Sequence, residues 1–180
     1  LKVNTESSNT AVGADALTAN TTGTANVAVG QGSLQSNTTG TNNTAVGQVA
    51  LRDTTTGSHN TAVGEEALKV NTTGDSNVAI GRNSLRANTT ADNNTAVGDN
   101  TLLVNTTGAD NVAVGRNSLD ANTTGGNNTA MGSGSLSSNT TAHNNTAVGY
   151  IALNANTTGT NNICIGPYTY TVITIPLRYS

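Results

Sequence analysis

The residue types that most often carry chemistry are few in this chain of 180 residues, and their spacing does not bring them together. His59 and His143 fall in non-equivalent turn positions of a repeat, without a Cys, Asp or Glu at the spacing of a metal site. Glu65 and Glu66 are adjacent, and no second acidic pair recurs to suggest an acid–base dyad. Cys164 stands where most repeats have Ala, which indicates a small buried residue rather than a nucleophile. We therefore expect no catalytic, cofactor-binding or metal-binding residue, no cofactor and no enzymatic activity.

Asparagine is the one polar residue type in a regular pattern that a modifying enzyme could recognise. Asn-x-Thr sequences are acceptors for N-glycosylation in secreted proteins. In N-T-T they occur at Asn20, Asn37, Asn71, Asn88, Asn105, Asn122, Asn139 and Asn156, and in N-N-T at Asn42, Asn93, Asn127 and Asn144. The alternative, which we favour, is that Asn and Thr stack into hydrogen-bonded ladders along one turn.

These residues belong to a strict repeat. The first Asn of N-[TVI]-[AC]-[VIM]-G returns every 17 residues from Asn9 to Asn162, without insertion or deletion. A glycine follows four places later in all ten units, at Gly13, Gly30, Gly47, Gly64, Gly81, Gly98, Gly115, Gly132, Gly149 and Gly166. A leucine follows eight places after the Asn in nine units, and Tyr170 replaces it in the last. A fixed period of this kind predicts a solenoid.

The repeat divides the chain into three parts. Residues 9–166 form ten 17-residue coils, and residues 1–8 resemble part of a preceding coil, so we expect a piece of a longer polypeptide or a processed product. Residues 167–180 depart from the repeat and predict one longer strand. That strand would either cap the last coil or pair with the next subunit.

Each coil is predicted to contain two short strands. The first covers N-[TV]-A-V-G and the second covers [AST]-L-x-x. The glycine turns the chain between them, and N-T-T-G closes the coil. The fold class is therefore all-β, a parallel β-roll or β-solenoid.

Charged residues of the repeats fall only at variable positions, so the two strand segments should be buried. Alternation places Val12 and Ala11 on opposite faces, and sequence alone leaves open which face points inward. We predict a core of the larger side chains, exemplified by Val12, Leu17, Val29, Leu34, Val46, Leu51, Val63 and Leu68.

Composition favours a fibrous protein over a globular one. The chain has no Phe or Trp, and 9% of its residues are charged. Disorder is the alternative for so polar a chain, but disorder does not explain why Val and Leu return at a fixed phase. The net charge is −3 with scattered basic residues, and there is no apolar run of membrane-spanning length. We expect neither nucleic-acid binding nor membrane insertion by this segment.

The unit N-[TV]-A-V-G-x-x-[AST]-L resembles the head repeats of trimeric autotransporter adhesins, and the NTAVG/NTTG arrays resemble those of phage and viral fibre proteins. The resemblance covers residues 9–166. It implies a left-handed β-roll in which three parallel chains pack about one axis. Independently, a thin coil with about two large apolar side chains would gain from burying a further face in a homo-oligomer.

Three functions follow as expectations. The first is a structural and adhesive fibre segment at a virion, phage-tail or cell surface, extracellular, with itself and a host-surface or matrix receptor as partners. The second is a self-assembling extracellular filament joined through residues 167–180. The third is an ice-binding solenoid, which is disfavoured because the first strand carries a single Thr per coil, replaced by Val or Ile in some coils.

Overall fold

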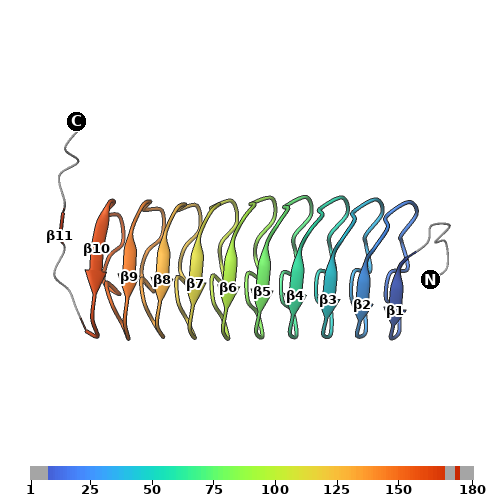
Figure 1. Ribbon diagram of the computed structural model, residues 1–180, viewed down its shortest axis with the longest axis horizontal. Coiled ribbons are helices and arrows are strands. Elements are labelled where there is room, and N and C mark those ends of the chain that lie inside the picture. The colour runs from blue at the N-terminus through green and yellow to red at the C-terminus, as the bar shows by residue number, and fades with distance from the viewer. Residues whose placement is uncertain (1–7, 169–172, 175–180) are drawn as a thin grey trace.

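The computed structural model describes residues 8–168 and 173–174 as one parallel β-solenoid, without a helix among those residues. Each coil contributes one strand to a single sheet, and the strands follow in chain order along the rod (Figure 1). Their bounds are β1 Thr10–Val12, β2 Val27–Val29, β3 Thr44–Val46, β4 Thr61–Val63, β5 Val78–Ile80, β6 Thr95–Val97, β7 Val112–Val114, β8 Thr129–Met131, β9 Thr146–Val148, β10 Asn162–Ile165 and β11 Ile173–Thr174.

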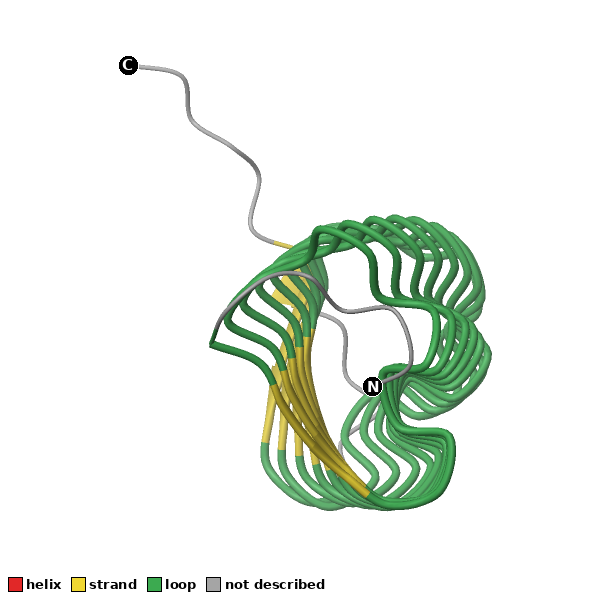
Figure 2. Ribbon diagram, turned by 90° about the vertical axis from the view of Figure 1, so that its right-hand side faces the viewer, coloured by secondary structure: helices red, strands yellow, loops and turns green. Residues whose placement is uncertain are grey.

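Strands β1 to β10 pair in parallel, and every residue lies beside its equivalent one repeat later. Thr44 pairs with Thr61, for example, and Ala45 with Ala62. A view along the rod shows the strands on one wall, with turns and loops forming the rest of each coil (Figure 2). The predicted all-β parallel solenoid is confirmed.

The predicted second strand is wrong. The segment after each turn glycine from Gly13 to Gly149 has no strand, and the repeat leucines, at 17-residue intervals from Leu17 to Leu153, have a positive φ of 47° to 52°. An L-residue in this left-handed region costs about 1–2 kcal/mol, whereas burying a leucine gains about 1.5–3 kcal/mol. The coils still stack here, because the Leu51 N–H donates to the Ala67 carbonyl at 3.0 Å. The leucine therefore turns the chain inward, and this closes the coil.

The core is built from Leu, Ala and Asn. The repeat leucines, at 17-residue intervals from Leu17 to Leu136, are fully buried, and so is the central alanine of strands β2 to β9. Leu17, Leu34, Leu51 and Leu68 are thus confirmed as core residues. Cys164 takes the alanine position in β10 and is 2% exposed, as expected for a small core residue.

The predicted valine core is wrong. Val12, Val46 and Val63 are 57%, 37% and 36% exposed, and Val29 is half-buried. The physical reason is the narrow interior, which Leu and buried Asn already fill, so only the small Ala of each strand points inward.

The C-terminal segment is described only in part. Strand β11 pairs antiparallel with β10 of the same chain, with Ile173 beside Ile163 and Thr174 beside Asn162. These two residues cover the edge of the last coil, as a cap would. Tyr170 and the rest of the predicted longer strand lie outside the described residues, as do residues 1–7.

Candidate interaction surface

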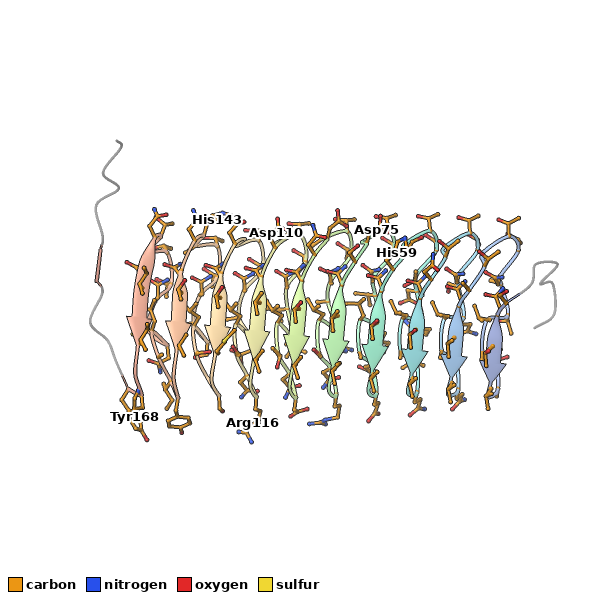
Figure 3. All side chains as sticks on the ribbon, in the orientation of Figure 1. His59, Asp75, Asp110, Arg116, His143 and Tyr168 are labelled. Atoms are coloured by element: carbon orange, nitrogen blue, oxygen red, sulfur yellow. The ribbon has the colours of Figure 1, made fainter. Side chains whose placement is uncertain are left out.

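The residues considered for catalysis lie apart from one another. His59 and His143 stand on the N-T-T-G side of the rod with Asp75 and Asp110, whereas Arg116 lies at the opposite edge (Figure 3). The His143 Nδ1 accepts a hydrogen bond from the Gly126 N–H at 2.8 Å, which is a contact between coils. Across residues 8–168 and 173–174, no group of His, Cys, Asp or Glu could hold a metal ion.

Glu66 belongs to an ion-pair cluster on the variable turn rather than to an acid–base pair. Its carboxylate accepts from Lys69 Nζ at 2.6 Å and from Arg86 Nε of the next coil. The hydrogen bond from Lys69, and then that from Arg86, lowers the pKa of Glu66 below its ordinary value. Glu65 has an exposed side chain and takes no part in these bonds. The cluster ties two coils together.

The turn glycines adopt a conformation that favours glycine. From Gly13 to Gly166 all ten have a positive φ, between 122° and 139°. This φ is open to glycine and strained for other residues. A side chain at Gly81 would also meet the backbone of the next coil, since its Cβ would lie 2.6 Å from the Gly98 carbonyl carbon.

Two columns of buried asparagines run along the rod. The first, which we call the strand-entry ladder, comprises Asn9 and its equivalents to Asn162. In it the Asn60 N–H donates to Asn43 Oδ1 at 3.0 Å, and Asn60 Nδ2 donates to the Gly74 carbonyl at 2.8 Å. Each such side chain therefore holds its own coil to the next one.

The second column, the turn ladder, consists of the N-T-T asparagines from Asn20 to Asn156, with Thr54 replacing one of them. Asn105 Nδ2 donates to Asn88 Oδ1 at 3.2 Å and to the Gly108 carbonyl at 2.9 Å. The predicted ladders are therefore present. The turn-ladder asparagines from Asn20 to Asn139 are fully buried, and Asn156, near the end of the rod, is half-buried. A glycan on these buried amides has no room in the folded coil, which argues against the glycosylation hypothesis there.

Because alanine points inward, the other two residues of each strand point outward. We call this wall the outer sheet face; it consists of the residues on either side of the central Ala or Cys in β1 to β10. Its third-position column is Val12, Val29, Val46, Val63, Ile80, Val97, Val114, Met131, Val148 and Ile165. Ile80 and Met131 are 40% and 43% exposed.

The outer sheet face carries no charge, and its third-position column is apolar over the whole length. The neighbouring column contains only Thr, Val and Ile, from Thr10 to Ile163. With a strand spacing of about 4.8 Å, ten strands extend over roughly 43 Å. Monomeric soluble proteins rarely expose a continuous apolar surface of this kind, and such surfaces mark interaction sites. Sequence reasoning missed this face because it assigned the valines to the interior.

No described residue lies in a helix long and apolar enough to cross a bilayer. Searches of family models, of curated proteins and of solved structures each returned no match to this chain.

Proposed function

We propose that this protein is a non-enzymatic structural and adhesive fibre segment at a cell, phage-tail or virion surface, and that its outer sheet face packs against further copies of the same chain. The observation that carries the proposal is the uncharged apolar column from Val12 to Ile165. Burying that column in a homo-oligomer removes it from water and stabilises a thin coil.

A left-handed parallel homotrimer is the form that the resemblance to adhesin heads suggests. In such a trimer the outer sheet faces of the three chains lie near a common axis, and the variable turns remain accessible. The surface left outside would carry the multivalent contacts of a fibre.

Solution mass tests the proposal. Light scattering of the purified chain should give three times the chain mass at micromolar concentration. Ile80→Glu places a charge in the middle of the outer sheet face and should lower that mass. Thr73→Glu is the matched control, because Thr73 is exposed in the N-T-T-G turn of the same region, and the mass should not change. A folded, monodisperse monomer of the unmodified chain would contradict the proposed assembly.

Ice binding is a second candidate that one observation favours. The outer sheet face is a regular array of Thr and Val, with in-register columns such as Thr44, Thr61 and Val78. Val27, Val78, Val112 and Ile163 interrupt the single Thr column, which weakens this candidate. An assay of ice recrystallisation separates the two, since a fibre segment should leave crystal growth unchanged.

A further inference from the structure

A polar groove crosses three coils on the variable-turn edge of the rod. It encloses about 300 Å³. Its floor is the coil of residues 128–144, which has only small residues here: Ser133, Gly134 and Ser137. Its walls come from the coils on either side, with Arg116 and Asp120 on one side and Tyr150 and Asn154 on the other.

The groove arises from side-chain size, because the backbone repeats unchanged through all three coils. The position of Ser137 is occupied by Arg52, Lys69 and Arg86 in earlier coils, and there the long side chains form ion pairs along the turn. One coil of small residues between two coils of larger ones therefore leaves a gap one coil wide.

Two side chains that carry oxygen acceptors line this groove, those of Asp120 and Asn154. One oxygen of each, Oδ1, is buried without a hydrogen-bond partner among the described residues, whereas the rest of the side chain is partly exposed. The two residues occupy equivalent positions two coils apart, so they are separated by about 9.6 Å along the rod. A bound molecule with hydroxyl groups at both ends can hydrogen-bond to the Asp120 carboxylate and to the Asn154 carboxamide, because a hydroxyl both donates and accepts. Burial also raises the pKa of the Asp120 carboxyl.

The other walls supply a donor and an aromatic ring. Arg116 forms no ion pair with the described residues, which leaves its guanidinium free to donate. Tyr150 is 49% exposed, and its ring packs edge-on against Tyr168 at 5.2 Å between centroids. This contact orients an aromatic surface beside the polar groups.

The chemistry of the groove selects among ligand classes. A divalent cation needs oxygens within about 2.6 Å of one centre, and acceptors about 9.6 Å apart cannot share one. The Asp120 carboxylate would repel a phosphate, and the groove has only one arginine, Arg116, to attract it. A pyranose carries hydroxyl donors around its rim and apolar C–H groups on its faces, and 300 Å³ is at the small end of ligand sites.

We propose that the groove between Arg116, Asp120, Tyr150 and Asn154 binds a neutral pyranose unit of a glycan. The sugar would be a ligand for the adhesive role proposed above, and in this respect the glycan site rests on that role. The groove itself needs only one chain, so sugar binding and oligomerisation can fail separately.

The test uses saturation-transfer NMR on the full chain with methyl glycosides of glucose, galactose, mannose and N-acetylglucosamine. At least one should receive saturation from the protein. Ser137→Arg should reduce that transfer at least tenfold by filling the groove, whereas Gln35→Arg, which introduces the same residue at the equivalent position in another coil, should leave it unchanged. Asn154→Ala removes one acceptor without adding bulk and should also weaken binding.

Either of two results would overturn the inference: no transfer to any of the four glycosides, or equal transfer with unmodified protein, Ser137→Arg and Asn154→Ala. Light scattering of the same samples reports the oligomeric state independently. A trimer that binds no glycoside would reject the glycan site and retain the fibre proposal.

Discussion

Thr54 interrupts the turn ladder, and replacing it by Asn should stabilise the protein. At the other steps of this ladder from Asn20 to Asn156, the Asn amide donates to the Asn one coil earlier, as Asn37 Nδ2 does to Asn20 Oδ1 at 2.8 Å. At Thr54 there is no amide to donate. As a result, Asn37 Oδ1 and Thr54 Oγ1 are both buried without a hydrogen-bond partner.

The size of the effect follows from the bonds that Thr54→Asn restores. The new amide would donate to Asn37 Oδ1 and to the Gly57 carbonyl, and its oxygen would accept from Asn71 Nδ2. Three bonds at about 1 kcal/mol each contribute about 3 kcal/mol. Loss of the buried Thr methyl group subtracts about 0.8 kcal/mol. The free energy of unfolding should therefore rise by about 2 kcal/mol, which for a chain of this size is roughly 4–8 °C in melting temperature.

Calorimetry and guanidinium unfolding at equal protein concentration measure this change, because an oligomer unfolds with a concentration-dependent midpoint. Thr54→Asp is the matched control. It has nearly the same shape as Asn but no amide donor, and it places a carboxylate against Asn37 Oδ1, so it should destabilise. The ladder argument is wrong if Thr54→Asn is no more stable than the unmodified chain, or if Asp stabilises as much as Asn.

Three other predictions concern single positions. Gly81→Val should lower the free energy of unfolding by at least about 3 kcal/mol, because strain at positive φ adds to a backbone clash with the next coil. Thermal unfolding measures this loss, and unchanged stability would refute the assigned turn. Val49→Asn should raise stability by about 1 kcal/mol in denaturant unfolding, because Val49 is β-branched at φ 51°; a loss of stability would refute the strain argument. Glu66 has a pKa lowered below its ordinary 4.5 by Lys69 and Arg86, so its contribution is present above pH 4.5 and lost as the pH falls further. Glu66→Gln should flatten the melting temperature between pH 5 and pH 3, and an unchanged pH profile would contradict this.

Periodicity in the sequence was sufficient to predict the parallel solenoid, the coil boundaries and the buried leucines. It succeeded because a 17-residue register with no insertion allows each residue to stack only on its equivalent. The turns at the glycines and the asparagine ladders also followed from residue type. Gly81 and Asn88, for example, both behave as their types predict.

Two features of the coil could not be predicted from periodicity and residue type. The [AST]-L-x-x pattern predicts a strand at Leu17, and only the closed coil with its buried leucine makes a positive φ favourable for this residue. The inward face of each strand was also undetermined, because alternation separates Val46 from Ala45 without orienting either. Leu51 and the ladder asparagines leave little space in the interior, so the small alanine rather than the valine points inward.

The groove could not be predicted for a different reason. Its walls, Asp120 and Asn154, are 34 residues apart, and each is unremarkable in its own repeat. Only stacking shows that Ser137 lies between them and is too small to fill the space. A comparison of side-chain volumes at equivalent positions of successive repeats would have found this signal.

Every coil of the repeat stacks on the next with the same 17-residue register, and this affects how the gene can change. Among β1 to β10, each strand contacts only its immediate neighbours in this series, always one repeat away. Duplication or deletion of one whole unit in frame therefore leaves the backbone pairing of the remaining coils as it was, and alters the length of the rod by about 4.8 Å. Unequal recombination between such similar units would produce these changes readily. We expect related genes to differ in the number of units and in the variable turns before they differ in the ladder asparagines.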